Sequence, residues 1–475
     1  MPGKTNMTGF LVRTDCYCRL ARELLPALAV AALLATFCSN SYANCSESER
    51  KLLVGPHAAA PVPGLADQAH PLVLCNLLPG QTIHIISLML ATDRRFFSSV
   101  QTFRITDAEL NTAKDAPIAG SYSGVEPDGY FWSMAETRDP PRDMLADVAS
   151  DPTAIIVRTE TEKNGTVSAH LDRNFGRRLS TARDIREDGI VGKLFMPKRH
   201  IPGRAAVIMI PGAGAPNFQT LTAYLLAARG FTVLSLPYYG LDGLPQQLES
   251  IPIEYFSQAI DLLRREYVGK DRKLFLLGIS RGTEAAAMAA LQRDDIAGLI
   301  LLSPSSVLNS GWGTGLQRRV PAWTLHGSPL PFMPSVDGED EVMRAQTPPY
   351  RTRARYDLRL DKLAENDSAR IPFENIESNV VLLSCDQDEV WPSARMSAEI
   401  AQRARTRGKR NVASYVFPGC GHDLGAPVAP TTIREYPWPK NGPLYTLGGT
   451  VQATWHGQKA AWSVLLRYLG ASEED

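Results

Sequence analysis

An alternation of short apolar runs with helical stretches, beginning near residue 185, constrains the fold of this chain most strongly. Runs such as 205–210 and 299–302 are apolar throughout, as are strands buried on both faces of a sheet. Stretches of helical composition, including 221–229 and 283–291, lie between such runs. Strand and helix in alternation indicate a parallel sheet with helices on both faces. We therefore expect a doubly wound α/β domain over residues 185–472.

The segment before this domain has a different pattern of apolar and polar residues. Residues 82–87, 154–159 and 166–171 alternate apolar with polar side chains, and Gly, Pro, Asn and Asp separate them. A period of two with frequent turns is typical of antiparallel strands, so residues 50–180 are predicted to form a small β-sandwich. Residues 303–378, rich in Pro and charge, are expected to be an insertion at the edge of the α/β sheet, of the kind that forms a lid.

The first 43 residues are predicted to be a signal peptide. Arg13, Arg19 and Arg22 precede an apolar run, 24–37, that ends shortly before the small residues Ser41 and Ala43. A membrane anchor is the alternative, but an uncharged run of this length does not comfortably span a bilayer. We therefore expect cleavage, no stable membrane insertion after it, and export to the periplasm or the medium.

Charge and cysteine content narrow the possible partners. Fifty basic residues balance fifty acidic residues, so the electrostatic field of the whole protein does not favour binding of nucleic acid.

The expected mature chain keeps four cysteines, and export permits disulfides. Cys385 with Cys420 and, less strongly, Cys45 with Cys75 are candidate pairs, and free thiols are the alternative. The chain has no closely spaced Cys/His cluster. No metal and no cofactor are expected, and the partner should be a small molecule.

The sequence Gly278-Ile-Ser-Arg-Gly282 carries the strongest chemical signal. It follows the apolar run 274–277 and leads directly into an alanine-rich helical stretch. A strand, a tight turn and a helix form the context of a nucleophile elbow, in which the turn exposes the serine hydroxyl at the C-terminal edge of the sheet. Without these flanks the motif would be weak, and an ordinary glycine-flanked turn would explain it. With them, Ser280 is the predicted nucleophile.

A serine nucleophile requires an imidazole base and a carboxylate that orients the base, in the chain order Ser, acid, His for this elbow. His422 lies in a glycine-rich loop after the predicted strand 412–417. Three acids follow the predicted strand 379–384, namely Asp386, Asp388 and Glu389. We favour Asp388 as the orienting acid and keep Asp386 as the alternative. The predicted triad is Ser280, Asp388 and His422.

An oxyanion hole requires backbone N–H groups that face the developing negative charge, one of them from the residue after the nucleophile. That residue is Arg281. The second N–H is expected from the small residues after the predicted strand 205–210, at Ala213, Gly214 or Ala215. A plain glycine-rich strand-to-helix connection is the alternative interpretation of that loop.

The chain resembles the family of acyl-CoA thioesterases and bile acid-CoA:amino acid N-acyltransferases. The resemblance rests on residues 116–132, which include Gly-Ser-Tyr-Ser-Gly-Val-Glu-Pro-Asp-Gly, and on Gly278-Ile-Ser-Arg-Gly-Thr-Glu284, Gln387-Asp-Glu-Val-Trp-Pro-Ser393 and Gly421-His422 in the same order. It implies an immunoglobulin-like sandwich followed by an α/β-hydrolase domain, with Ser280, Asp388 and His422 as the triad. The chain departs from the family in its oxyanion loop and in its predicted signal peptide.

The resemblance also implies the activity. Conjugating acyltransferases of the family are similar to this chain but carry cysteine at the elbow, so serine favours hydrolysis. We expect an acyl-CoA thioesterase that works through an acyl-serine intermediate. An exported general carboxylesterase or lipase-like hydrolase and an N-acyltransferase are the alternative enzymes. A non-catalytic scaffold, with a sandwich that binds carbohydrate or protein, is the alternative outside enzymes.

Overall fold

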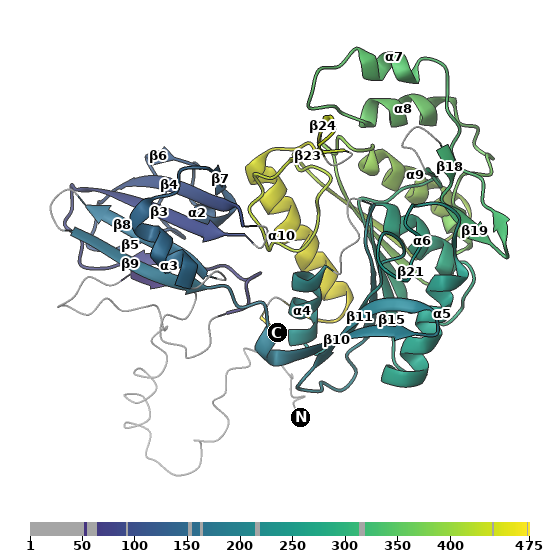
Figure 1. Cartoon of the computed structure of the whole chain (residues 1–475), viewed down its shortest axis with the longest axis horizontal. Helices are drawn as coiled ribbons and strands as arrows, with labels where there is room; N and C mark the ends of the chain where they lie inside the picture. Colours follow the sequence, from purple (N-terminus) through teal and green to yellow (C-terminus); the bar gives the residue numbers. More distant parts are fainter. Residues whose placement is uncertain are drawn as a thin grey trace, which may run out of the picture. The chain divides into compact units, whose positions relative to one another are not determined.

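The computed structural model describes residues 52–54 and 64–475, with gaps at 92–93, 151–153, 162–164, 214–218, 313–318, 439–440 and 473. An eight-stranded sheet dominates these residues (Figure 1). In spatial order its strands are β10 (Ser180–Glu187), β11 (Ile190–Pro197), β13 (Thr232–Ser235), β12 (Ala206–Ile210), β15 (Leu274–Ile279), β16 (Gly298–Leu302), β21 (Asn379–Cys385) and β22 (Val412–Phe417). The predicted signal peptide lies outside the described residues.

The direction of the strands follows from their connections. Strands β10 and β11 form a hairpin, and β11 pairs antiparallel with β13. The remaining neighbours pair in parallel. Numbered along the chain, the order in the sheet is 1-2-4-3-5-6-7-8, which is an α/β-hydrolase type of architecture. The carboxyl ends of the parallel strands therefore meet at one edge of the sheet, where loops deliver functional side chains.

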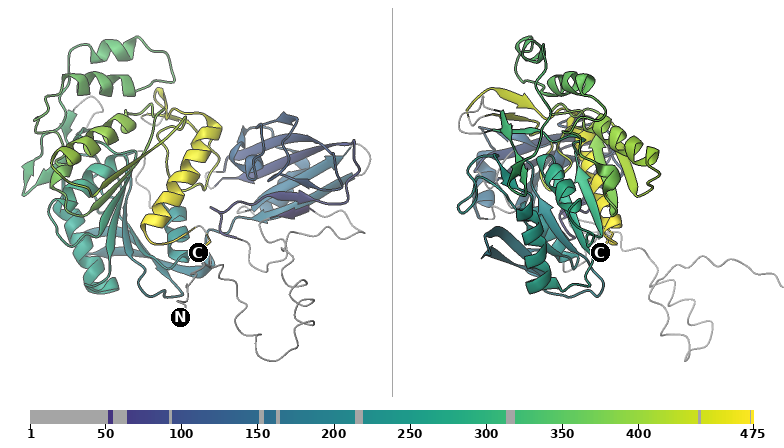
Figure 2. Two further views of the ribbon diagram at one scale, coloured as in Figure 1. Left: turned by 180° about the vertical axis from the view of Figure 1, so that it is seen from behind. Right: turned by 90° about the vertical axis from the view of Figure 1, so that its right-hand side faces the viewer.

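Alternate residues of the parallel strands face two different helical layers, because successive side chains point to opposite faces. Ile208 and Leu276 share a core with α5 (Glu254–Leu263) and α6 (Arg281–Ala290). Val207 and Leu277 share a second core with α4 (Thr220–Ala228) and α10 (Val451–Tyr468). Figure 2 shows α10 against one face of the sheet. Helix α9 (Ser393–Thr406) contributes Ile400 to the first core.

The segment before the large sheet forms two antiparallel sheets. One contains β1 (Leu52–Val54), β2 (Leu72–Leu74) and β5 (Leu110–Asn111). The other contains β6 (Ala119–Gly120), β4 (Phe96–Arg104), β3 (Thr82–Leu90), β8 (Ala154–Thr161) and β9 (Gly165–Asp172), with β7 (Ala135–Thr137) paired to β4. Side chains from both sheets, such as Leu72 and Ile85, share one apolar core. We call the described residues of segment 52–174 the β-domain. It also holds η1 (Arg142–Met144) and the helices α2 (Gly129–Trp132) and α3 (Leu145–Ser150).

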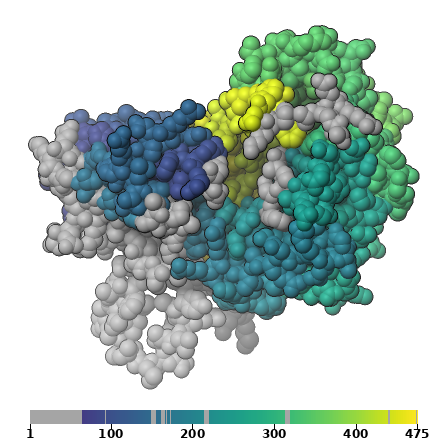
Figure 3. Space-filling model, in the orientation of Figure 1, coloured from purple at the N-terminus to yellow at the C-terminus, as the bar shows by residue number. Residues whose placement is uncertain are grey.

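The predicted insertion lies between the neighbouring strands β16 and β21. Its elements are β17 (Ser310–Trp312), β18 (Arg319–Pro321), β19 (Trp323–Leu325), β20 (Ser328–Pro329), α7 (Glu339–Arg344), α8 (Arg353–Lys362) and η4 (Phe373–Asn375). A small core that includes Leu360 and Trp391 anchors it beside the sheet edge. Tyr350 pairs with the hairpin of β23 (Glu435–Pro437) and β24 (Leu444–Thr446). Figure 3 shows the insertion in green and the C-terminal segment in yellow at the same surface.

Three short elements complete the described chain, namely η2 (Arg177–Leu179), β14 (Ile251–Pro252) and the π-helical turn η3 (Arg264–Val268). Within the part of the chain that the structure describes, no helix combines the length and the apolar character needed to cross a membrane.

Candidate active site

Ser280 lies on a sharp turn between β15 and α6. Its backbone adopts φ +52° and ψ −121°, a conformation that non-glycine residues rarely adopt. The two flanking glycines allow this turn because backbone atoms approach them closely. A Cβ on Gly282 would lie 2.2 Å from the carbonyl oxygen of Ile210, and one on Gly278 would lie 2.7 Å from the carbonyl oxygen of Gly282. The geometry is that of a nucleophile elbow.

His422 reaches Ser280 from the loop between β22 and β23. Its Nε2 lies 2.9 Å from the Oγ of Ser280, although the two residues are 142 positions apart in the chain. A neutral imidazole with its proton on Nδ1 can accept the serine proton at Nε2. The backbone fixes the loop, since the N–H of His422 donates to the carbonyl of Leu447 at 2.8 Å.

Asp388 completes the constellation from the loop after β21. Its Oδ2 lies 2.8 Å from the Nδ1 of His422, and the carboxyl group is fully buried. The other oxygen, Oδ1, accepts hydrogen bonds from the backbone N–H groups of Val390 at 2.9 Å and Trp391 at 3.2 Å. Donors on both oxygens hold the carboxylate in one orientation and fix the tautomer of His422.

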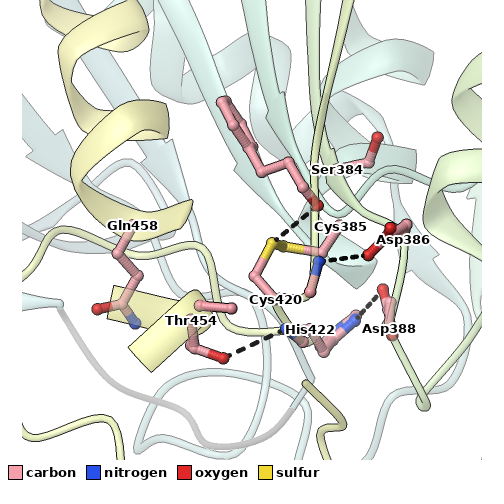
Figure 4. The surroundings of a disulfide bond; sticks show 12 residues. Ser384, Cys385, Asp386, Asp388, Cys420, His422, Thr454 and Gln458 are labelled. Carbon is pink, nitrogen blue, oxygen red and sulfur yellow. Dashed lines mark hydrogen bonds and ion pairs between the residues drawn. A yellow bond between two sulfur atoms is a disulfide. The ribbon is translucent and has the colours of Figure 1, made fainter. Parts of the chain in front are cut away.

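The two other acids of this loop have different partners. The Oδ1 of Asp386 accepts from the N–H of Gly419 at 2.7 Å and thereby ties the acid loop to the loop of His422. Burial raises the pKa of Glu389, while Arg351 and Arg353 oppose this shift. The structure thus places Asp388 against His422, and Asp386 in a bond to the backbone (Figure 4).

The predicted oxyanion hole is partly described. Arg281 is the first residue of α6, so its backbone N–H has no acceptor within the helix. Gly212 passes close to the nucleophile, since a Cβ there would lie 3.0 Å from the Cβ of Ser280. The carbonyl of Ala213 accepts a hydrogen bond from the hydroxyl of Tyr239. Gly214 and Ala215 lie outside the described residues.

A buried polar network at the start of α6 supports the elbow. The guanidinium of Arg281 pairs with Glu284 at 3.0 Å, so this side chain points into the protein. Glu284, which is completely buried, also accepts hydrogen bonds from Asn309 at 2.9 Å and from the indole N–H of Trp323 at 2.9 Å. Burial raises the pKa of Glu284 although Arg281 and these donors oppose the shift. The network fixes the start of α6 and therefore the N–H of Arg281.

A disulfide joins the two loops that carry the acid and the histidine. Cys385 and Cys420 are bonded, with their Cα atoms 5.2 Å apart, which is one of the two alternatives that the sequence left open (Figure 4). Both are buried; Cys385 is the last residue of β21, and Cys420 lies in the loop after the neighbouring parallel strand β22. Cys75 is also disulfide-bonded. The candidate partner that the sequence offered, Cys45, lies outside the described residues.

Three supporting residues were not identified from the sequence. The hydroxyl of Ser303 donates to the carbonyl of His422 at 2.7 Å. The ring of Trp391 meets the imidazole edge-on at 5.3 Å between centroids, and its N–H donates to the carbonyl of Ser303 at 3.2 Å. From the insertion, Arg353 donates to the carbonyls of Asp386 at 2.8 Å and Asp388 at 3.3 Å. Trp391 lies in segment 387–393, which carries part of the family resemblance. For Ser303, the one available signal in the sequence was its position directly after a buried strand.

Two family models match this chain. The model described as BAAT / acyl-CoA thioester hydrolase C terminal matches residues 251–472. The model described as acyl-CoA thioester hydrolase/BAAT N-terminal region matches residues 67–187. Among solved structures, a putative dienelactone hydrolase from Klebsiella pneumoniae superimposes with a TM-score of 0.38 at 11% identity, over 61% of this chain and 98% of that chain.

Curated relatives extend over most of the chain. The bile acid-CoA:amino acid N-acyltransferase of Mus musculus is 24% identical, over 86% of this chain and 96% of the relative. Acyl-coenzyme A thioesterase 1 of the same organism is 26% identical, over 77% of this chain and 84% of the relative. Two family models in the expected order and relatives over nearly their full length lead to one conclusion. The chain belongs to the acyl-CoA thioester hydrolase/BAAT family.

Proposed function

We propose that this protein is a serine hydrolase that cleaves acyl thioesters, with acyl-CoA as the substrate class, to free acid and thiol. The observation that carries the proposal is the hydrogen-bonded series Ser280, His422 and Asp388 at the elbow, with 2.9 Å and 2.8 Å between the bonded atoms. Membership of a family with thioesterase relatives supports the choice of substrate.

The first half of the reaction forms an acyl-serine. The Oγ of Ser280 attacks the thioester carbonyl carbon while the Nε2 of His422 takes the hydroxyl proton. Asp388 stabilises the resulting imidazolium at Nδ1. The carbonyl oxygen becomes an oxyanion, which the backbone N–H of Arg281 and an N–H of the loop after β12 stabilise. Collapse of the tetrahedral intermediate breaks the carbon–sulfur bond, and His422 returns its proton to the leaving thiolate.

The second half releases the acid. His422 removes a proton from a water molecule, and the hydroxide attacks the acyl-serine carbonyl carbon. The second tetrahedral intermediate collapses with cleavage of the bond to Oγ. Ser280 recovers its proton from His422, so the enzyme is unchanged and one water has been consumed for each thioester.

Two other enzymes are the competing proposals, and a rate panel separates the thioesterase from the carboxylesterase. Acyl-CoAs and nitrophenyl esters with matched acyl groups are compared by kcat/KM, with Ser280→Ala as the blank. A thioesterase gains from transition-state contacts with the remote coenzyme portion, so acyl-CoAs should exceed their matched esters. If nitrophenyl esters are faster with every acyl group, a general carboxylesterase replaces the thioesterase.

The acyltransferase alternative is decided by products. With glycine or taurine present, a hydrolase yields free acid, because water is the acceptor at the acyl-serine. An amino-acid conjugate detected by mass spectrometry would move the assignment to the N-acyltransferase branch, to which one relative belongs by name.

The proposal extends to location and domain type. We propose that residues 1–43 are removed on export. The support is the pattern of that segment, in which basic residues precede an apolar run and small residues follow it. N-terminal sequencing of the secreted or periplasmic protein should begin at Asn44, and a chain that retains Met1 in the cytosol would contradict export.

We further assign the β-domain to the immunoglobulin-like class, on the support of its two antiparallel sheets around one core.

A further inference from the structure

The last helix, α10, has two functional faces. Gln452, Trp455, His456 and Lys459 lie on one side, at the three- and four-residue spacing of a helix face, and all four contact the β-domain. Thr454, Gly457 and Gln458 lie on the opposite side. These three residues contact the loop that carries His422.

The contact with the β-domain centres on Glu126. One carboxylate oxygen of this buried residue accepts from the Nε2 of His456 at 2.8 Å and from the Nε2 of Gln452 at 2.8 Å. The ring of Phe131 meets Trp455 edge-on at 5.7 Å, and Trp455 is part of the core of the β-domain. Glu126 and Phe131 both belong to the segment that carries the family resemblance in this half of the chain.

A second contact fixes the chain that follows His422. Arg173 stacks its guanidinium on the ring of Phe131 at 3.8 Å and donates to the carbonyl of Val428 at 2.6 Å. The N–H of Thr431 donates to the carbonyl of Trp132 at 3.2 Å. The β-domain therefore holds both α10 and the segment that leads from His422 to it.

The opposite face of α10 transmits this support to the active site. The Oγ1 of Thr454 accepts from the N–H of Gly421, the neighbour of His422, at 3.4 Å (Figure 4). Gln458 donates to the carbonyl of Asp423 at 3.3 Å, on the other side of the histidine. Gly457 lies so near the disulfide that a Cβ there would be 2.8 Å from the Sγ of Cys420. The backbone on both sides of His422 thus rests on this helix.

We propose that the β-domain is a positioning element for the catalytic base: through Glu126 and α10 it holds His422 in register with Ser280. This proposal rests on the proposed function, in which His422 is the base. A small displacement of the imidazole lowers the rate without removing any catalytic group. Glu126 is thus a positioning residue, since it touches neither substrate nor the reacting atoms.

The experiment measures how fast a fluorophosphonate probe labels Ser280 in the full chain, because that reaction needs the serine and its base but no natural substrate. Glu126→Ala should slow labelling and lower kcat by roughly two- to thirtyfold, with KM nearly unchanged. Glu126→Gln keeps an acceptor oxygen and should stay near wild type. His456→Ala, at a half-exposed side chain, tests the same contact from the helix and should be slowed in the same direction.

Glu136→Ala is the matched control. Glu136 is an acid of the same domain, on β7, and its partner Arg95 is exposed. The control should label at the wild-type rate. Labelling of folded Glu126→Ala and His456→Ala at the wild-type rate would overturn the positioning role. A wild-type protein that does not label would instead reject the serine hydrolase function, so the two failures are distinguishable.

Discussion

At the scale of single residues, the site depends on side chains that act in series. In the proposed mechanism Ser280 supplies the nucleophile, His422 the base and Asp388 the orientation of the base, and each contact has one donor and one acceptor. Removing one of these side chains should therefore lower the rate by an amount that depends on which catalytic groups remain. The proposed oxyanion donors are backbone groups, which side-chain substitutions leave in place.

Ser280→Ala and His422→Ala should each lower kcat by about a thousandfold or more without unfolding the protein. Asp388→Asn should lower kcat less than either of these substitutions, because the serine and the oxyanion hole remain. Steady-state rates on the favoured substrate, with circular dichroism as the check on folding, measure the series. A substantial residual rate in folded Ser280→Ala would remove the nucleophile assignment.

Trp391→Phe tests the support of the imidazole. Phenylalanine keeps a ring edge near His422 but loses the N–H that donates to Ser303, which leaves a buried carbonyl without that donor. A loss of about 1–3 kcal/mol in the free energy of unfolding is expected. Urea denaturation measures it, and Phe256→Leu in the core that α5 and α6 share with the sheet serves as a comparison for packing alone. A stability equal to wild type would show that this hydrogen bond contributes nothing.

At the scale of elements, the two catalytic loops are tied together by strands, by Asp386 and by the disulfide. Cys385→Ala with Cys420→Ala removes a cross-link with a sequence separation of 35 residues. From the closure entropy of a loop of that size, the double variant should lose about 3–4 kcal/mol of stability in the oxidised protein. Chemical denaturation with and without a reductant checks this value. Equal stability of the oxidised and reduced wild type would contradict it, and free thiols at both positions before reduction would exclude the bridge.

The sequence predicted elements well where the signal is local. The apolar run before Ser280 and the alanine-rich stretch after it define strand, turn and helix without any distant contact. Asp386 and Asp388 are only two positions apart, and spacing alone left both open, because the curvature of the loop decides which of them faces His422. Ser303 escaped notice for a related reason. Its partner lies 119 residues away, and no local pattern marks it.

At the scale of the whole molecule, the pair of Glu126 and His456 should make stability depend on pH. The hydrogen bond that His456 donates to Glu126 raises the pKa of His456 more than burial lowers it. Burial would raise the pKa of Glu126, but hydrogen bonds from His456 and Gln452 outweigh it, and that pKa is lowered. A raised histidine pKa stabilises the fold fully below the unfolded value of about 6.5 and loses this effect as pH rises through the folded value. The lowered carboxyl pKa stabilises above about 4.3 and loses its effect as pH falls through the folded value.

The stability difference between wild type and His456→Gln should therefore be largest near pH 6 and should shrink toward pH 9. Glutamine keeps a donor for Glu126 but does not titrate. Urea midpoints across this range measure the difference. A difference that is constant with pH would mean that protonation of His456 is not coupled to folding. Since His456 is half exposed, salt should weaken the effect.

The position of α10 in the chain also sets an order of events during synthesis. Ser280 leaves the ribosome long before the helix that supports His422, and that helix ends at Tyr468 of a chain of 475 residues. In the proposed mechanism, a nascent chain can therefore expose its serine before α10 holds the backbone on both sides of His422. A chain that stops before this helix should accordingly react more slowly than the chain that contains it.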